Sequence, residues 1–409
     1  MTEKTEYNTP RHRGTEGQIQ LFSSVARCLG VSYLCVHLAS CTSASFTQVS
    51  DTPAGAYEAS LAPVPNGFVA AWYDTRDGHG EIYVRRLDPA GTPIAAERRL
   101  TSGTADAYEA DIAPTRDGFV VGWYEKAEDG RLTPKVGAFS LDGTSRWLKT
   151  LSMRGRNTVV RTAGGLVFIA WIEDEGDDRA GVWATWRRSD GVDLVPPRRV
   201  ADAGRTTWNL NAAVAPDASP GNPHAWIAFD AKAGTKSEEL FLAEVTETSD
   251  HIVQLTPDDG AESKYPDIAL TDDRAAVTWF DKKDGNEEVY LAVGDRAAVT
   301  SGHLAPTRVT STSGHSIGAY LTWNGGRLGL AWCDDTEGNQ ELYFQSFGAD
   351  GHATGPVTRV TTTSRSSSIP AIKPAGSGFA LLWNEHDPVT GDGHGGGTLK
   401  SQVVFRLVP

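Results

Sequence analysis

Short apolar runs recur along this chain, and each is followed by a polar turn. At 68–72 every residue is apolar, and an Asp- and Gly-rich turn leads from there into a β-prone run at 81–87. A run with no polar alternation indicates a strand that is buried on both faces. With the flanking runs at 57–62 and 98–101, each unit predicts four short antiparallel strands whose second strand lies between two neighbouring sheets.

An acidic residue follows a Trp by two positions in six units. In a seventh unit, at 225–230, the acid is retained and the aromatic residue is shifted. The seven acids are spaced 51, 48, 57, 51, 53 and 51 residues apart, and such a period indicates an array of equal units. We therefore predict an all-β fold, a seven-bladed β-propeller of four-stranded antiparallel blades. We call these acids the rim acids: Asp74, Glu125, Glu173, Asp230, Asp281, Asp334 and Glu385.

The two ends of the repeat array complement each other. The seventh unit ends after three strands, whereas 46–50, ahead of the first unit, is similar to the fourth strands at 307–310 and 358–361. Pairing 46–50 with the last unit would remove two exposed sheet edges. The sequence therefore predicts a ring that the N-terminal strand closes non-covalently.

The turn after each second strand is expected on one face of the ring, so the rim acids should gather there as candidate ligand contacts. Oxygen-rich turns of this kind can bind Ca²⁺. The spacing differs from an EF-hand, and an acid repeated in every blade can equally accept hydrogen bonds from backbone N–H groups of the neighbouring loop. No cofactor is required, and calcium remains possible. Three units carry a second acid seven residues on, giving the candidate metal pairs Asp74 and Glu81, Asp281 and Glu288, and Asp334 and Glu341.

Aromatic residues fall into two groups. The repeated Trp residues end apolar strands at equivalent positions, which indicates packing between blades. Four further aromatic residues begin units at the acid-bearing face and are candidate ligand contacts, with packing against loops as the alternative. They are Tyr57, Tyr108, Trp208 and Tyr265.

The segment before the repeats has a different character. An apolar stretch at 29–38 is too short to span a bilayer as a helix, and residues 38–41, Leu-Ala-Ser-Cys, resemble a bacterial lipobox. The resemblance implies a signal segment at 1–40, with a possible true start near Val25, and lipidation of Cys41. It predicts an exported protein held on a membrane in the periplasm or at the cell surface. Residues 41–409 would form a single propeller domain.

Charge and motifs limit the chemistry. A net charge of −14 disfavours nucleic acid as a partner. The chain has no His-Glu-x-x-His or phosphate-loop motif, so a non-enzymatic role is favoured and catalysis stays open. Glycoside hydrolysis needs only two suitably placed carboxyl groups, which a ring of acids can supply. Cys333 is the one cysteine after Cys41, which indicates a buried thiol and no disulfide framework.

The unit at 67–91 resembles the WD40-like propeller repeat of the periplasmic protein TolB, and its Trp and long period are similar to sialidase-type propellers of bacterial surface lipoproteins. Residues 140–147 match the Asp-box motif of sialidases only in part. These resemblances cover residues 46–409 and imply the fold. The function we predict is binding of an envelope or extracellular protein, or another ligand, through the acidic face. The alternative is a carbohydrate-binding lectin or a divergent sialidase-like glycosidase.

Overall fold

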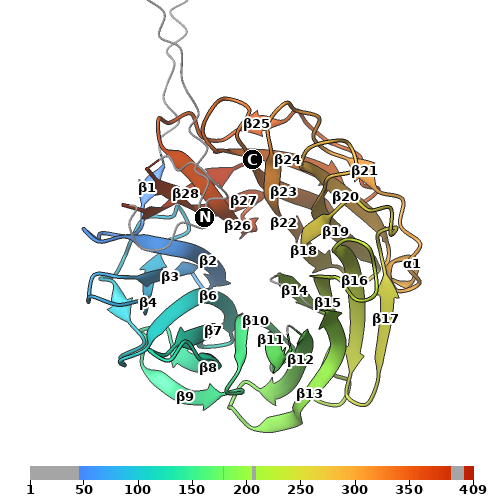
Figure 1. Ribbon diagram of the computed structural model, residues 1–409. Helices are drawn as coiled ribbons and strands as arrows, with labels where there is room; N and C mark the ends of the chain where they lie inside the picture. Colours follow the sequence, from blue (N-terminus) through green and yellow to red (C-terminus); the bar gives the residue numbers. More distant parts are fainter. Residues whose placement is uncertain (1–45, 178, 205–208, 388–399) are drawn as a thin grey trace, which may run out of the picture. The chain divides into compact units, whose positions relative to one another are not determined.

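A computed structural model describes residues 46–177, 179–204, 209–387 and 400–409, which belong to one compact unit, Ser43–Pro409. The predicted signal segment, Cys41 and Trp208 lie outside the described residues. Figure 1 shows seven four-stranded sheets set as blades of a ring, so the predicted all-β, seven-bladed fold is confirmed.

Six blades follow one another along the chain, and their strands are numbered from the axis outward. Blade 1 contains β2 (Ala56–Val64), β3 (Gly67–Asp74), β4 (Glu81–Leu87) and β5 (Arg98–Arg99). Blade 2 contains β6 (Asp106–Thr115), β7 (Gly118–Lys126), β8 (Leu132–Ser140) and β9 (Ser145–Thr150). Blade 3 contains β10 (Gly155–Ala163), β11 (Leu166–Gly176), β12 (Arg179–Arg188) and β13 (Asp193–Gly204).

The second half of the ring repeats this order. Blade 4 contains β14 (Leu210–Val214), β15 (His224–Ala231), β16 (Glu239–Thr246) and β17 (Asp250–Gln254). Blade 5 contains β18 (Ser263–Leu270), β19 (Arg274–Asp281), β20 (Glu288–Asp295) and β21 (Thr307–Arg308), with α1 (Arg296–Thr300) before β21. Blade 6 contains β22 (Ser316–Asn324), β23 (Arg327–Asp334), β24 (Glu341–Gly348) and β25 (Thr358–Arg359). Among the described residues no helix is long and apolar enough to cross a membrane.

Blade 7 joins the two ends of the chain, as predicted. It contains β26 (Ser366–Ala375), β27 (Gly378–His386) and β28 (Gln402–Val408), and its outermost strand is β1 (Thr47–Gln48). Thr47 pairs with Phe405 and Gln48 with Val404, and the Val49 N–H donates to the Val403 carbonyl at 2.8 Å. Phe46 also packs edge-on against Trp383 at 5.7 Å, and Val49 is buried in the core. The N-terminal strand therefore closes the ring without a covalent bond.

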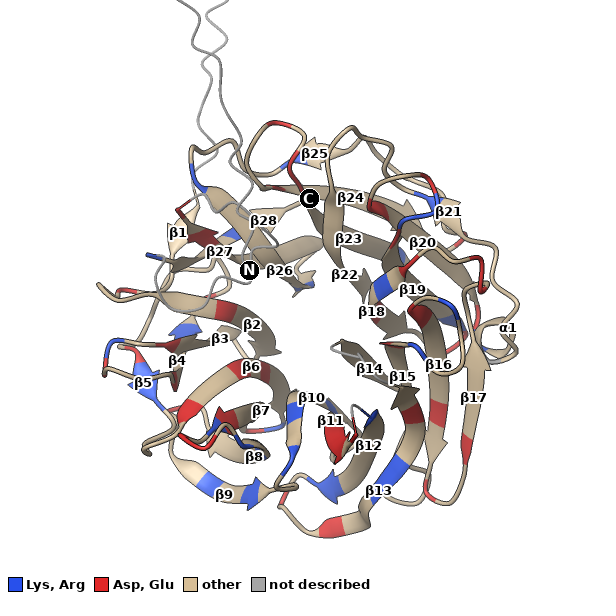
Figure 2. Ribbon diagram, in the orientation of Figure 1, with Lys and Arg blue, Asp and Glu red and all other residues tan. Residues whose placement is uncertain are grey.

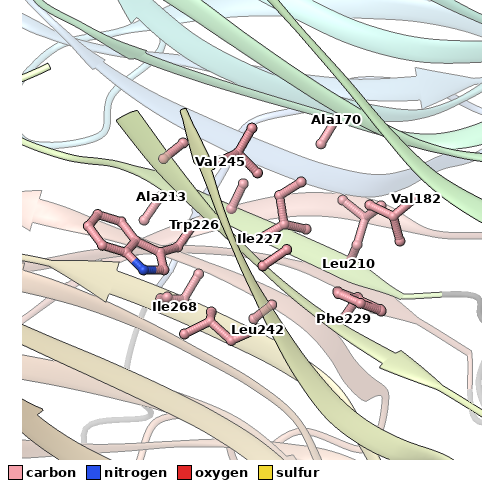
Figure 3. Packing of buried hydrophobic residues seen from close by; sticks show 14 of the residues in the cluster. Ala170, Val182, Leu210, Ala213, Trp226, Ile227, Phe229, Leu242, Val245 and Ile268 are labelled. Carbon is pink, nitrogen blue, oxygen red and sulfur yellow. The ribbon is translucent and has the colours of Figure 1, made fainter. Parts of the chain in front are cut away.

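The core lies between the blades. The second strands are buried almost throughout, and Trp72, Trp171 and Trp383 have no exposed surface. In four blades the Trp near the end of the second strand stacks on the aromatic residue opposite it on the third strand. The pairs are Trp72–Tyr83, Trp171–Trp183, Trp279–Tyr290 and Trp332–Tyr343. Figure 3 shows one such inter-blade cluster, to which Trp226, Ile227 and Phe229 of β15 contribute. The repeated aromatic residues are therefore structural.

Blade 4 corrects one detail of the predicted repeat. Phe229 pairs with Phe241 and stacks on it at 5.7 Å, which is the place that Trp72 holds in blade 1. Ala231, opposite Glu239, then occupies the place of the rim acid. The aromatic residue is therefore in register and the acid Asp230 is displaced by one position. Because strand side chains alternate between faces, Asp230 points to the opposite face of its sheet from Asp74.

Bulges interrupt the innermost strands. In blades 1, 2, 3, 5, 6 and 7 the pairing of the first strand shifts register after two or three residues. A residue with positive φ stands at each shift, and a bulge of this type bends the strand and re-aims its side chains. These residues are Glu58, Glu109, Asn157, Tyr265, Gly318 and Ile369, with φ of 50°, 53°, 52°, 56°, 60° and 53°.

Candidate functional site

Most rim acids are buried and bond to their own blade. The indole N–H of the Trp two positions earlier donates to Asp74 at 3.3 Å and to Glu385 at 2.8 Å; both acids are at most 3% exposed. Glu125, Glu173 and Asp281 receive the same bond from their Trp residues. Trp and acid two apart share one strand face, which explains the fixed spacing.

The rim acids also hold the chain that enters each blade. Hydroxyl groups from that connection donate to three of them, Thr52 to Asp74 at 3.1 Å, Thr312 to Asp334 at 3.0 Å and Thr363 to Glu385 at 3.2 Å. In these blades the donors from the connection are therefore side-chain hydroxyls, where the sequence analysis expected backbone N–H groups. With their oxygens used in this way, the buried rim acids have little capacity left for an external ligand.

The second acid of each candidate metal pair forms what we call the lock, a buried Glu at the start of the third strand that bonds to a Thr two residues after the fourth strand. Glu288 is fully buried and accepts from Thr310 Oγ1 at 2.5 Å and from the Thr312 N–H at 2.9 Å. The same bonds reach Glu81 from Thr101 and Gly103, and Glu341 from Thr361 and Thr363. Glu239 of blade 4 bonds to Thr256 at 2.7 Å.

The lock continues across the ring closure with an amide in place of the acid. Ser50 Oγ donates to Gln402 Oε1 at 2.8 Å, and Gln402 Nε2 donates to the Thr52 carbonyl at 2.6 Å. Every lock is thus completed by protein donors. In the part of the chain that the structure describes, no group of three or more His, Cys, Asp or Glu side chains could hold a metal ion, and calcium binding by the pairs stays the alternative that the sequence left open.

Blades 2 and 3 lack the lock. Thr133 lies opposite Glu125, and Gly181 lies opposite Glu173, at the positions where Glu81 faces Asp74 in blade 1. Glu125 is 22% exposed and pairs with Lys135 at 2.6 Å. The repeat therefore departs from its own pattern on one side of the ring.

On that side, two acids occupy bulges of innermost strands. The backbone N–H of Glu109 hydrogen-bonds to the Glu58 carboxyl, and the N–H of Asn157 to the Glu109 carboxyl, so each acid reaches the next blade. Burial, reinforced by the charge of Glu109, raises the pKa of Glu58 to about 8. Burial raises the pKa of Glu109 to about 7, against the opposing effect of Arg156. Both carboxyl groups are therefore protonated to a larger extent near neutral pH than ordinary glutamates.

Asp230 acts in a similar way on the other side of the ring. Its Oδ2 accepts from the Tyr265 N–H at 3.0 Å, across to blade 5, and burial raises its pKa to about 6. In blade 7 the Asn384 side chain accepts from the Ala59 N–H at 3.1 Å. The inner edge of each first strand has no partner strand, and these side chains satisfy its backbone groups from the preceding blade.

Four tyrosines form a row beside the bulge acids. Tyr57 stacks on Tyr73 at 5.1 Å, Tyr73 meets Tyr108 edge-on at 5.0 Å, and Tyr108 packs on Tyr124 at 5.6 Å. Burial, with the nearby Glu carboxylates, raises the pKa of Tyr73 and of Tyr124. Of the aromatic residues that the sequence singled out, Tyr57 and Tyr108 thus come together. Tyr265 instead stacks on Phe280 in blade 5.

We call this group the mouth cluster. Burial lowers the pKa of Arg156, against the effect of Glu109, and Figure 2 shows acidic residues on β2 and β6 and basic residues on β10 in the innermost strands. Glu58, Glu109 and Arg156 were not among the site residues predicted from the sequence. A signal was present, because the triplet Tyr-Glu-Ala occurs at both 57–59 and 108–110. The members of the mouth cluster are Glu58, Glu109, Arg156, Tyr57, Tyr73, Tyr108 and Tyr124.

Cys333 is the remaining residue of chemical interest. It is 2% exposed, and burial raises the pKa of its thiol to about 12. A thiol with so high a pKa is a poor nucleophile at neutral pH. The predicted buried thiol is therefore confirmed.

No family model matches this chain, and no curated protein matches it. Among solved structures it is similar to the endosialidase of phage phi92, with a TM-score of 0.51 and 8% identity over 90% of this chain and 69% of that one. It is also similar to a prolyl endopeptidase (TM-score 0.49, 12% identity, 88% of this chain and 50% of that one). A neuraminidase-like N10 protein of a bat influenza A virus matches with a TM-score of 0.42 and 7% identity, over 89% of this chain and 98% of that one. The chain spans half the length of the prolyl endopeptidase, and at such identities the likeness shows the propeller fold alone.

Proposed function

We propose that this protein is an exported, lipid-anchored, non-enzymatic propeller that binds an envelope protein or another polar ligand through the mouth cluster. One observation carries the proposal. The lock that holds other blades is replaced in blades 2 and 3 by Thr133 and Gly181, and the same side of the ring carries the row of tyrosines and the bulge acids. Departures from a repeat's own structural rule are expected at functional or strained sites.

The chemistry of the cluster supports a ligand rich in hydroxyl or amide groups. Tyr108 and Tyr124 are partly exposed, and tyrosine offers an apolar ring face together with a hydroxyl group. Protonated Glu58 and Glu109 donate hydrogen bonds, and Arg156 adds further donors. Carbohydrates and peptide backbones both present the matching acceptors.

A divergent glycosidase is the second candidate, and a different observation favours it. Glu58 and Glu109 are neighbours whose pKa values are raised to about 8 and about 7. A general acid for glycoside hydrolysis must be a carboxyl group that stays protonated at the working pH. The sialidase-type structural neighbour adds only an analogy of fold to this argument.

Binding by matched variants tests the proposal. Arg156 and Lys264 both stand one residue before a bulge, in blades 3 and 5, so Lys264→Ala is the control for Arg156→Ala. On a glycan array, and with any protein that co-purifies from the envelope fraction, Arg156→Ala should weaken binding at least tenfold and Lys264→Ala should leave it unchanged. Equal binding by the two variants would sink the proposal. Sugar release that is abolished in Glu109→Gln would favour the glycosidase.

Membrane anchoring is a separate part of the proposal, and it rests on the lipobox-like residues 38–41. Cys41→Ala should move the protein from the membrane fraction to the soluble fraction, or trap the precursor, because the thioether-linked lipid is then absent. Intact-mass measurement of the protein from its native host checks this directly. An unprocessed chain that begins at Met1 would contradict it.

A further inference from the structure

A cavity opens between blades 5 and 6, on the face of the ring opposite the rim acids. The rim acids stand where second strands end, whereas this cavity lies at the turns between first and second strands and between third and fourth strands. Its volume is about 440 Å³, which is within the range of small-molecule sites. The residues that line it include Thr271, Asp273, Arg274, Trp323, Gly326 and Asp350.

Trp323 forms part of the cavity wall and is specific to blade 6. It stands opposite Leu328 in the sheet, and its indole N–H donates to the Ala269 carbonyl of blade 5 at 3.3 Å. The ring is therefore fixed across the boundary between the two blades. A departure from the repeat is expected at a functional or strained site. The equivalent positions of the other blades hold smaller residues, namely Pro63, Pro114, Thr162, Val214, Leu270 and Pro374.

Gly326 keeps the cavity open. A Cβ atom at this position would meet no atom of the described residues within 4 Å, and the φ of Gly326 lies outside the left-handed region. Neither backbone conformation nor packing therefore requires a glycine here. A larger side chain at Gly326 would enter open space beside Trp323 without straining the turn.

Arg274 of β19 joins the two blades at the cavity, and its charge is balanced within the chain. Its Nη2 donates to the Ala349 carbonyl of blade 6 at 2.7 Å, and its Nη1 pairs with Asp295 at 2.6 Å. Arg274 therefore acts as a structural bridge, and its positive charge is offset by that of Asp295.

The two carboxylates at the cavity have no such balance. Thr271 Oγ1 donates to Asp273 Oδ1 at 3.0 Å, and the His352 N–H donates to Asp350 Oδ1 at 3.0 Å, so each side chain is oriented by its own turn. Within the described part of the chain Asp273 has no ion-pair partner. Asp350 Oδ2 lies 3.5 Å from the ring of His352, which is 85% exposed, and so exposed a pair contributes little. The cavity therefore carries a net negative charge.

We propose that this cavity binds a small organic cation of the aliphatic diamine class. The Oδ2 atoms of Asp273 and Asp350 accept hydrogen bonds from the two ammonium groups, and the methylene chain between them lies against the apolar surface of Trp323. The net charge of −14 adds a long-range attraction for cations. The site lies on the other face of the ring from the mouth cluster and does not depend on the ligand bound there.

Titration of the full-length protein with putrescine tests this site, and butylamine and butanediol serve as comparison ligands. Melting temperature and calorimetric binding are measured at one low ionic strength, because salt screens exposed charges. The wild type should show a saturable rise in melting temperature with putrescine, because a ligand that binds only the folded state stabilises it. Butylamine should bind roughly fivefold more weakly, since it meets one carboxylate instead of two, and butanediol should not bind.

Substitutions at the cavity test which residues hold the ligand. Asp273→Asn and Asp350→Asn should each weaken putrescine binding by roughly fivefold, the contribution of one exposed charge pair. Gly326→Leu should weaken it by about tenfold or more, because the new side chain occupies the cavity. The melting temperature of each variant without ligand shows whether it is folded. If Gly326→Leu does not fold, the two carboxylate variants, whose side chains lie on exposed turns, decide the outcome.

Three controls should bind putrescine as the wild type does. Gly221→Leu adds a side chain in open space away from the cavity, and Asp217→Asn removes an exposed carboxylate that pairs with Arg296. Arg156→Ala disables the mouth cluster, so its unchanged binding separates this site from the function proposed above. The proposal would be overturned by no saturable response of the wild type to putrescine, by butanediol binding as tightly as putrescine, or by cavity variants that bind no more weakly than these controls.

Discussion

The lock contains an acid, Glu288, in blade 5 and an amide, Gln402, in blade 7. We predict that Glu288→Gln and Gln402→Glu each destabilise the folded protein. In blade 5 the group that faces Glu288 is the Thr312 N–H, a donor at 2.9 Å. In blade 7 the group that faces Gln402 Nε2 is the Thr52 carbonyl, an acceptor at 2.6 Å. Glu288→Gln therefore removes the charge that its donors address, and Gln402→Glu sets a carboxylate against a carbonyl.

The cost follows from burial. Glu288 is fully buried, and a hydrogen bond to a charged group contributes about 1.5–3 kcal/mol, with about 1–3 kcal/mol more when a buried donor loses its partner. We expect Glu288→Gln to lower the free energy of unfolding by about 3 kcal/mol. We leave out the bond from Arg308, because that side chain is 34% exposed. Gln402 is partly exposed, so Gln402→Glu should cost less, about 1–2 kcal/mol.

Calorimetry and urea unfolding measure these changes. For a ring of this size the entropy of unfolding is about 0.8 kcal/mol/K, so 3 kcal/mol corresponds to a fall in melting temperature of about 4 °C. Glu125→Gln is the control, because Glu125 is 22% exposed and its ion pair with Lys135 should contribute less than about 1 kcal/mol. A Glu288→Gln protein as stable as the wild type, or a control that loses as much, would refute the reasoning.

Three further predictions concern the whole ring. Deleting residues 46–50 removes β1 and the Ser50 bond to Gln402, so the truncated protein should self-associate or lose cooperative unfolding in size-exclusion chromatography and calorimetry; a stable monomer would contradict the closure. The free energy of unfolding should fall as the pH rises from about 5 to about 8. The reason is that Glu58 and Glu109, with pKa values of about 8 and about 7, bind protons more tightly in the folded protein than in the unfolded chain. Urea unfolding midpoints should show this fall, and the fall should be smaller in Glu58→Gln. Melting temperatures in calcium and in chelator should be equal, since the oxygens of Glu288 and Glu341 already accept protein donors; a rise in calcium that is absent when the paired acids are neutralised would establish a metal site.

The sequence by itself determined the ring. Apolar second strands such as 68–72, Gly- and Asp-rich turns and a period near 51 residues are local signals, because strand burial and turn geometry depend on neighbouring residues. The closing strand was also predictable, since 46–50 resembles the fourth strands that it replaces. The role of the repeated Trp residues followed from their fixed place at strand ends.

Only the tertiary structure decided which acids come together. The displacement of Asp230 depends on strand register, and a shift of one residue reverses the face on which a side chain lies. Glu58 and Glu109 lie 51 residues apart in sequence, and Glu109 and Arg156 lie 47 residues apart. Bulges re-aim these side chains, and the packing of blades 1, 2 and 3 against one another brings them together. Such proximity arises from the packing of whole blades, which no local pattern of hydrophobic and polar residues encodes.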